Sequence, residues 1–330
     1  MIRPGARNLI TDVPGIRVGN AQDMKLLTGV TVLLPDRPCV AAVDVRGGGP
    51  GTRETDALDP ANLVETVDAL VLSGGSAFGL DAASGVSSWL AARGRGFAVG
   101  PARVPIVPAA ILFDLLNGGD KDWGDTPPYR EMARAACDAA AADFALGNAG
   151  AGTGAKAGAL KGGLGSVSAI DDVTGFAIGA LAAVNPVGSV VMPGQSTLWA
   201  WAFELDGELG GQAPPHRPVP PEPDLPSELH PGANTTLVAV AVDAPLTRAQ
   251  ALRVAIMAQD GIARAIRPAH TPYDGDTVFV LATGEGHPPG PAVVARIGTL
   301  AADCVSRAIA RGVYEAAPAG RWPSWRTTFG

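Results

Sequence analysis

Apolar residues along this chain occur in short runs bounded by glycine and proline, a pattern that predicts buried strands. The clearest run, residues 237–242, is apolar at every position, which is typical of a strand covered on both faces. Shorter runs bounded by turn residues predict further strands at 15–19, 29–34, 39–45, 69–72, 166–170, 176–184 and 277–281. Short strands separated by longer segments indicate a mixed α/β protein.

Other segments have the spacing of helices. The chain after the strand at 69–72 predicts a helix that ends near residue 92, and the Ala-rich segment 131–142 predicts a second helix. Thr247 and Gln250 have the spacing of a capping box, so a third helix is expected from there to about Ile266. The buried stripe of a final helix is marked by Val293, Ile297, Leu300, Cys304 and Ala308.

A proline-dense segment, residues 206–233, divides the chain before the run at 237–242. Eight prolines between 214 and 231 exclude regular structure there, so we expect an exposed, extended linker. The parts on either side, 1–234 and 235–330, each lack the elements to bury a core alone. The whole chain, 1–330, is therefore predicted to form one domain.

Composition narrows the classes of function. The net charge is −7 and no Lys/Arg cluster is present, which argues against a nucleic-acid partner. No apolar segment has the length of a membrane span and no secretion signal is visible, so a cytoplasmic protein is expected. The three cysteines are widely spaced and the four histidines show no ligand spacing, so neither a disulfide framework nor a metal site is expected. Nucleotide-binding fingerprints are also absent, and no cofactor is predicted.

The junction Asn234–Thr235 offers distinctive chemistry, because it places a threonine at the start of the most apolar strand. Cleavage of this bond would give Thr235 a hydroxyl nucleophile and an α-amine whose pKa is about 8, able to accept the hydroxyl proton. The alternative is a threonine chosen for its β-propensity at a strand entry.

Three other polar segments contain candidate helpers. Asp274 and Asp276, at the mouth of the strand 277–281, could hydrogen-bond an ammonium group and a hydroxyl, although Asp-Gly is also a common turn. Asn185 lies in the most apolar part of the chain and could donate to an oxyanion, or it could simply form an Asn-Pro turn. The glycine-dense stretch 147–165 contains Lys156 and Lys161, either of which could stabilise negative charge. A surface loop is the alternative for that stretch.

Taken together, these motifs resemble the DmpA-like family of N-terminal-nucleophile hydrolases, which includes L-aminopeptidase/D-amidase/esterases, β-aminopeptidases and endo-type 6-aminohexanoate-oligomer hydrolases. The resemblance spans nearly the whole chain and follows the family's order. It rests on DVPGIRVG at 12–19, VRGGGPGTRE at 45–54, LSGGSAFGL at 72–80, the glycine-rich 147–165, NPVG at 185–188, NTT at 234–236 and DGDT at 274–277.

The resemblance implies an αββα sandwich of the DmpA/ornithine-acetyltransferase type that cuts itself before the nucleophile, giving an α chain (1–234) and a β chain (235–330). Thr235 matches the nucleophile, Asn185 the oxyanion donor, and Asp274 with Asp276 the pair that orients the new amine and hydroxyl. NTT with DGDT is similar to the nylon-oligomer branch. The expected partner is a small molecule or peptide with an amide bond, and a homotetramer is implied.

The resemblance also implies a substrate pocket at Gly74, Gly75, Ser76 and Phe113. Phe113 stands where relatives have a tyrosine that assists catalysis, and the lysine of the nylon enzymes matches Lys156 or Lys161. Two other functions remain open at this stage. One is an acyltransferase like the ornithine acetyltransferases, which share the general fold and use a threonine nucleophile. The other is a non-catalytic small-molecule binding protein.

Overall fold

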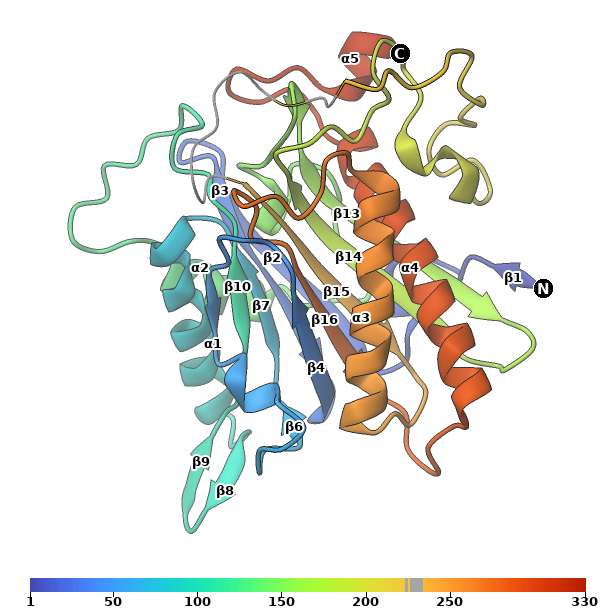
Figure 1. The fold of residues 1–330 in the computed structure, drawn as a ribbon. Helices are drawn as coiled ribbons and strands as arrows, with labels where there is room; N and C mark the ends of the chain where they lie inside the picture. Colours follow the sequence, from blue (N-terminus) through green and yellow to red (C-terminus); the bar gives the residue numbers. More distant parts are fainter. Residues whose placement is uncertain (223–224, 226–233) are drawn as a thin grey trace.

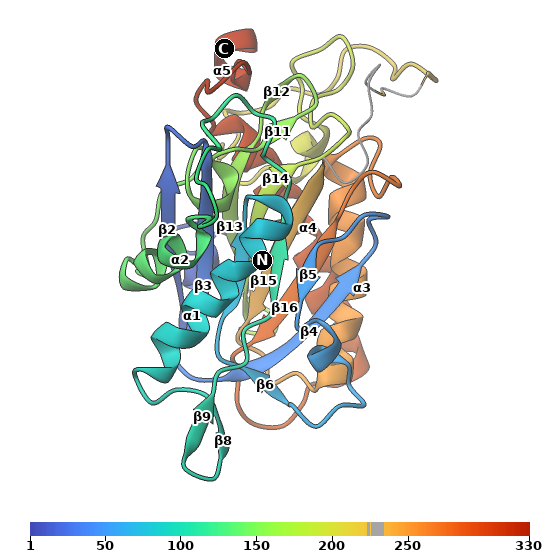
Figure 2. The same ribbon diagram turned by 90° about the vertical axis from the view of Figure 1, so that its left-hand side faces the viewer.

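Two stacked sheets form the centre of the molecule, and helices cover both outer faces (Figures 1 and 2). The computed structural model describes residues 1–222, 225 and 234–330. The layers therefore run helix, sheet, sheet, helix, which confirms the expected αββα sandwich.

The larger sheet has seven strands, and its middle strands come from the second half of the chain. In spatial order they are β1 (Ile2–Arg3), β13 (Gly163–Asp171), β14 (Ala177–Asn185), β15 (Thr235–Val242), β16 (Thr277–Ala282), β4 (Cys39–Val45) and β6 (Thr66–Val67). β15 runs antiparallel to β14 along its whole length and parallel to β16 from Leu237 to Val242, so it lies between two partner strands.

The smaller sheet is built from the first third of the chain. Its five strands are, in order, β2 (Ile16–Asp23), β3 (Thr28–Pro35), β7 (Leu70–Ser73), β10 (Ala109–Ile111) and β5 (Thr52–Arg53). Two small hairpins lie outside the sheets: β8 (Phe97–Val99) with β9 (Ala102–Val104), and β11 (Lys156–Ala157) with β12 (Leu160–Lys161).

The helices divide between the two outer faces. α3 (Arg248–Ala265) and α4 (Pro291–Tyr314) pack on the seven-stranded sheet, while α1 (Ala82–Ala91) and α2 (Tyr129–Asp138) pack on the five-stranded sheet. The short α5 (Trp325–Phe329) lies at the C-terminus. The 3₁₀ turns are η1 (Ile10–Asp12), η2 (Asp56–Leu58), η3 (Ser76–Asp81), η4 (Gly150–Gly152) and η5 (Trp199–Phe203).

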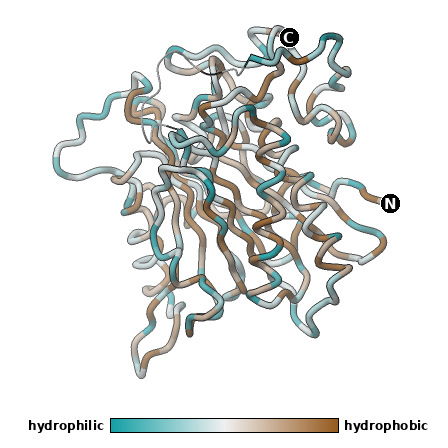
Figure 3. Tube along the Cα trace, in the orientation of Figure 1, coloured by the Kyte–Doolittle hydropathy of each residue, from teal (hydrophilic) through white to brown (hydrophobic). Residues whose placement is uncertain are grey.

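The apolar run that contains β15 is buried on both faces because it separates two cores. Val238, Val240 and Val242 pack toward α3 and α4. Leu237 and the alanines that alternate with the valines pack between the sheets. A third core lies under α1 and α2. Figure 3 shows the hydrophobic stretches concentrated along the central strands. The uninterrupted hydrophobicity of 237–242 is thus explained by its central position.

Two expectations about local structure need correction. The helix expected at 131–142 spans Tyr129–Asp138, because Ala141 instead pairs with Val18 of β2 through two backbone hydrogen bonds of 3.1 Å. The expected linker is not exposed along its whole length. Leu209 is fully buried, and the buried Glu208 binds Arg307 of α4, with Nη2 2.8 Å from Oε2. Residues 223–224 and 226–233 of that segment lie outside the described residues.

No helix among the described residues combines the length and the apolar character needed to cross a lipid bilayer.

Candidate active site

Thr235 begins β15 at the end of the sheet where β14 ends. It stands opposite Asn185 in the ladder, and the exposed fraction of Thr235 is 2%. The Thr235 hydroxyl donates to the carbonyl oxygen of Asn234, the residue that precedes it. The backbone N–H of Gly275 donates to the same oxygen at 3.0 Å. Two donors therefore meet on the carbonyl of the bond expected to be cut.

Gly275 leaves the space that the Thr235 hydroxyl occupies. A Cβ atom at position 275 would lie 2.6 Å from Oγ1 of Thr235, closer than a real carbon–oxygen contact. The parallel bridge between Asn234 and Asp274 holds this loop against the strand entry. A glycine in the Asp-Gly-Asp motif is therefore required by the position of the hydroxyl rather than by an unusual backbone angle.

Asp276 holds the start of β15 through the residue next to Thr235. Its Oδ1 accepts the N–H of Thr236 at 2.8 Å. Its Oδ2 accepts the backbone N–H of His270 at 3.0 Å and lies 2.9 Å from Nδ1 of the same residue. The side chain is buried, so these contacts fix the carboxylate within hydrogen-bonding range of the strand entry.

Asp274 is fully buried and fastens the turn that follows Asn185. Its Oδ1 accepts the N–H of Val187 at 3.0 Å, and its Oδ2 accepts the N–H and hydroxyl of Thr271 at 2.9 and 2.6 Å. Burial and then the nearby charge of Asp276 raise its pKa above the ordinary value. In the intact chain, none of these hydrogen bonds joins either carboxylate to Thr235, and the one nearest to Thr235 joins Asp276 to Thr236.

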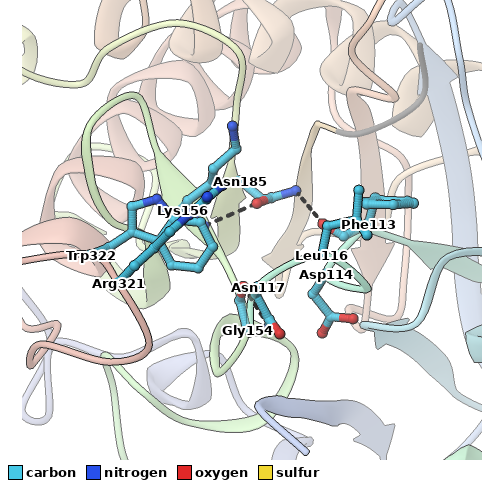
Figure 4. Close-up of a pocket in the computed structure, with 9 residues that line it drawn as sticks. All are labelled: Phe113, Asp114, Leu116, Asn117, Gly154, Lys156, Asn185, Arg321 and Trp322. Carbon is cyan, nitrogen blue, oxygen red and sulfur yellow. Dashed lines mark hydrogen bonds between the residues drawn. The ribbon is translucent and has the colours of Figure 1, made fainter. Parts of the chain in front are cut away.

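The Asn185 side chain is held in one orientation by the backbone. Its Oδ1 accepts the N–H of Lys156 at 3.0 Å, and its Nδ2 donates to the carbonyl of Phe113 at 3.1 Å (Figure 4). Because one partner is an obligate donor and the other an obligate acceptor, the two ends of the amide cannot be exchanged. The second hydrogen of Nδ2 is left for another acceptor, and Asn185 lines a cavity of about 90 Å³.

The two candidate lysines occupy different environments although they pair in one hairpin. Lys161 is buried, and its Nζ donates to the carbonyls of Gly152 and Gly162 at 2.9 and 2.8 Å. Burial lowers the pKa of Lys161 to about 7, and Asp114 opposes that shift. Lys156 is half-buried and lines the cavity beside Asn185.

The cavity next to Asn185 involves more of the chain than the motifs indicated. Its nine lining residues include Phe113, as expected, and they are Phe113, Asp114, Leu116, Asn117, Gly154, Lys156, Asn185, Arg321 and Trp322. Sequence reasoning missed Leu116, Asn117, Arg321 and Trp322, which belong to no motif. Asp114 directly follows Phe113 and could have been found from that neighbour.

The loop Gly74-Gly75-Ser76 stands behind this cavity and does not line it. Gly75 donates its N–H to Oδ1 of the buried Asp114 at 2.9 Å, so the loop supports the cavity through that carboxylate. Gly75 has a φ of +85°, and a Cβ there would meet the Tyr129 ring, so both the conformation and the space require glycine. The loop therefore lies outside the lining of this cavity, and a substrate contact at Gly74, Gly75 or Ser76 stays a prediction.

No group of three or more His, Cys, Asp or Glu side chains within the described ranges could hold a metal ion.

The chain is similar to known proteins over most of its length. The model of peptidase family S58 matches residues 8–321. An uncharacterized aminopeptidase of Mycobacterium tuberculosis is 48% identical, over 98% of this chain and 98% of its own length. A 6-aminohexanoate-oligomer endohydrolase of an Agromyces species is 28% identical, over 85% of this chain and 76% of its own.

A solved structure supports the fold. The L-aminopeptidase D-Ala-esterase/amidase of Ochrobactrum anthropi, a variant of the Ntn hydrolase fold, has a TM-score of 0.70 and 21% identity, covering 95% of this chain and 87% of its own. These comparisons confirm the resemblance to the DmpA-like hydrolases. The chain belongs to peptidase family S58, and it is an amide-bond hydrolase of the aminopeptidase type.

Proposed function

We propose that this hydrolase cuts its own chain at Asn234–Thr235 and then uses Thr235 as an N-terminal nucleophile. The observation that carries the proposal is the pair of donors on the Asn234 carbonyl, namely the Thr235 hydroxyl and the Gly275 N–H. These contacts support the proposal because an attack on that carbonyl needs the hydroxyl close to it and a donor for the oxyanion.

The cut proceeds in two balanced steps. Thr235 Oγ bonds to the carbonyl carbon of Asn234, the C–N bond breaks, and the hydroxyl proton passes to the leaving nitrogen. An ester and a free α-amine result. Water then hydrolyses the ester, which restores the Thr235 hydroxyl and leaves Asn234 with a terminal carboxylate. The Gly275 N–H stabilises the oxyanion formed on the way to the ester.

In turnover, the new α-amine takes the proton of the Thr235 hydroxyl as Oγ attacks the substrate amide. Asn185 stands opposite Thr235 in the ladder and has one amide hydrogen left for the oxyanion. An acyl-enzyme forms, the substrate amine departs with a proton, and water releases the acyl product. Losing the Asn185 donor should raise the barrier by about 2.7–4 kcal/mol.

The two aspartates contribute by position. Asp276 accepts the N–H of Thr236, one residue from the nitrogen that becomes the amine, and this contact supports a role in orienting an ammonium group there. Asp274 fixes the turn after Asn185 and so keeps the oxyanion donor aligned with β15. Lys161 bonds two carbonyls of the glycine-rich loop, which favours a role in shaping that loop.

The substrates that we propose are short peptides, amino-acid amides or 6-aminohexanoate oligomers. The names of the relatives support these classes, because they include an aminopeptidase and a 6-aminohexanoate-oligomer endohydrolase. The small cavity beside Asn185, with Phe113 and Trp322 in its lining, supports a short, partly apolar group next to the scissile bond. The resemblance to the DmpA-like family further supports a homotetramer.

Intact-mass spectrometry of the purified protein tests the proposal. We expect two fragments, residues 1–234 and 235–330, and amidase activity that appears with them. The variant Thr235→Ala should remain a single chain, with activity at least about 10⁴-fold lower, because the nucleophile is absent. Thr235→Ser keeps a hydroxyl and should still be cut. A wild-type chain that stays whole and hydrolyses no amide would contradict the proposal.

A further inference from the structure

Two cationic side chains meet on one wall of the cavity beside Asn185. Lys156 extends from the β11–β12 hairpin, and Arg321 comes from the segment before α5. Burial lowers the pKa of Lys156, and the positive charge of Arg321 lowers it further, so the two charges lie within electrostatic range. Within residues 1–222, 225 and 234–330, neither side chain takes part in an ion pair.

Neighbouring charges of one sign raise the free energy of the empty site unless an anion compensates them. Asp114, the carboxylate on the opposite side of the cavity, is poorly placed to compensate these two charges. Asp114 accepts hydrogen bonds from Gly75 and Thr28, and its ion-pair partner is Lys121 at 3.9 Å. The two cations are therefore available to an anion that enters from outside.

The walls of the cavity differ in chemistry. Arg321 lies over the ring of Trp322, with Cζ 5.1 Å from the ring centroid, which restrains the guanidinium. Figure 4 shows Lys156, Arg321 and Trp322 on one side of the cavity, Phe113 and Leu116 on the other, and Asn185 between them. A ligand that reaches Asn185 thus passes between apolar groups and a pair of cations.

Asn185 connects this pair of cations to the proposed chemistry. Its Oδ1 accepts the backbone N–H of Lys156, so the proposed oxyanion donor and the cationic wall are one hydrogen bond apart. A substrate carbonyl at Asn185 can have its following atoms beside Lys156. In a dipeptide, the atoms after the scissile amide end in the free C-terminal carboxylate of the leaving amino acid.

We propose that Lys156 and Arg321 bind the free carboxylate of the leaving group, so that the preferred substrates are dipeptides or short amino-acid oligomers with an unblocked C-terminus. This inference rests on the proposed function and adds the substrate class to it. It gives Lys156 a role in binding substrate. Arg321 has the fork of donors that matches a carboxylate, and its stacking on Trp322 reduces the ordering needed on binding.

The experiment compares a dipeptide with the same dipeptide blocked as its C-terminal amide. For the wild-type enzyme, kcat/KM should favour the free carboxylate, and the preference should shrink at high salt because the cavity is open to solvent. Arg321→Gln should reduce the preference about tenfold, mainly through KM, which is the scale of one charge-assisted hydrogen bond. Lys156→Gln should act in the same direction. Arg321→Lys should restore only part of the preference, because lysine keeps the charge but lacks the fork of donors and the stacking on Trp322.

The matched control is Arg103→Gln, which removes an exposed arginine from the β8–β9 hairpin outside the cavity. It should leave the preference unchanged. The mass of each variant is measured as well. A cut, active enzyme with equal kcat/KM for both dipeptides, or a preference that Arg321→Gln does not alter, overturns this inference alone. A wild-type chain that is neither cut nor active overturns the proposed function and the inference with it.

Discussion

The two sheets hold the site in different ways. In the seven-stranded sheet, β15 pairs with β14 over all eight of its residues and with β16 from Leu237 on, and the ladder with β14 sets Thr235 opposite Asn185. In the five-stranded sheet, the strands nearest the cavity are short, four residues in β7 and three in β10. There the cavity is shaped by the loops that follow those strands, which meet on the buried Asp114.

The difference between the two sheets suggests that one holds the reacting groups and the other shapes the cavity that would bind substrate. A strand paired along a ladder cannot slip by one position without turning its side chains to the opposite face, so the seven-stranded sheet can hold a nucleophile and a donor in register. Loops tolerate changes in length and sequence more readily than a central ladder does, so the five-stranded sheet is suited to shaping a substrate cavity. Variants on each side should therefore fail in different ways.

The largest effect is expected from Gly275→Ala, at the mouth of the seven-stranded sheet. The new methyl group would lie 2.6 Å from Oγ1 of Thr235 and push the hydroxyl off the Asn234 carbonyl. Gly275 does not adopt a positive φ, so the fold should persist. We expect self-cleavage to be at least about 10²-fold slower. Gel electrophoresis of samples taken over time measures this rate. Gly290→Ala, where a Cβ meets nothing within 4 Å, is the control. Cutting at the normal rate in Gly275→Ala would argue against the proposed geometry.

An intermediate effect is expected from Lys161→Met, made in an uncut Thr235→Ala chain so that a single chain unfolds. In the folded protein the pKa of Lys161 is lowered to about 7, whereas the unfolded chain keeps it near 10.5. Between these values the unfolded chain binds more protons, so the free energy of unfolding should rise with pH, by at most about 1.4 kcal/mol per pH unit.

Lys161→Met should remove this rise between pH 7 and 10, as measured by denaturant titration at several pH values. Lys25→Met, at a side chain that is 81% exposed, should leave the rise unchanged. Equal pH dependence in Lys161→Met and its parent would show that the buried amine does not titrate in that range.

The smallest effect is expected from Asp114→Asn, in the loop after β10. Burial raises the pKa of Asp114, so its charge contributes little net stability. An amide oxygen can still accept the N–H of Gly75. We expect the free energy of unfolding to change by about 1 kcal/mol or less, with self-cleavage intact.

The same variant tests the link between the two sheets. Because the charge of Asp114 raises the pKa of Lys161, Asp114→Asn should move the rise of stability with pH to lower pH. Asp125→Asn, in the exposed part of the same loop, is the control. A Lys161 transition at the same pH in Asp114→Asn would contradict the coupling.

The central strands were predictable because a strand buried on both faces has an uninterrupted run of apolar residues. The run at 237–242 and the glycine-bounded runs before it gave the strands that carry Thr235 and Asn185. β10 was missed because it has three residues and follows Pro105 and Pro108, which do not indicate a strand. The burial of Glu208 was missed because a proline-dense segment gives no local sign of a distant partner such as Arg307.

The candidate site was predictable only where motifs carry it. Thr235, Asn185 and the two aspartates stand in short patterns that can be recognised from their chemistry and order. Arg321 and Trp322 reach the cavity from a C-terminal segment without a motif, and only tertiary packing brings them to Asn185. The different environments of Lys156 and Lys161 were not predictable either, because only the folded hairpin buries Lys161 and leaves Lys156 in the lining of the cavity.

The central position of β15 has a consequence for how the enzyme is made. If the chain is severed before Thr235, the C-terminal piece supplies β15 and β16, which stay clasped between β14 and β4 of the N-terminal piece. Neither piece can leave without dismantling the sheet. Folding must then come before cutting. A denatured mature enzyme would have to reassemble from two separate chains, a concentration-dependent step that the uncut chain does not require. The stability of the mature enzyme would accordingly be kinetic, set by the rate at which it unfolds and its two chains dissociate.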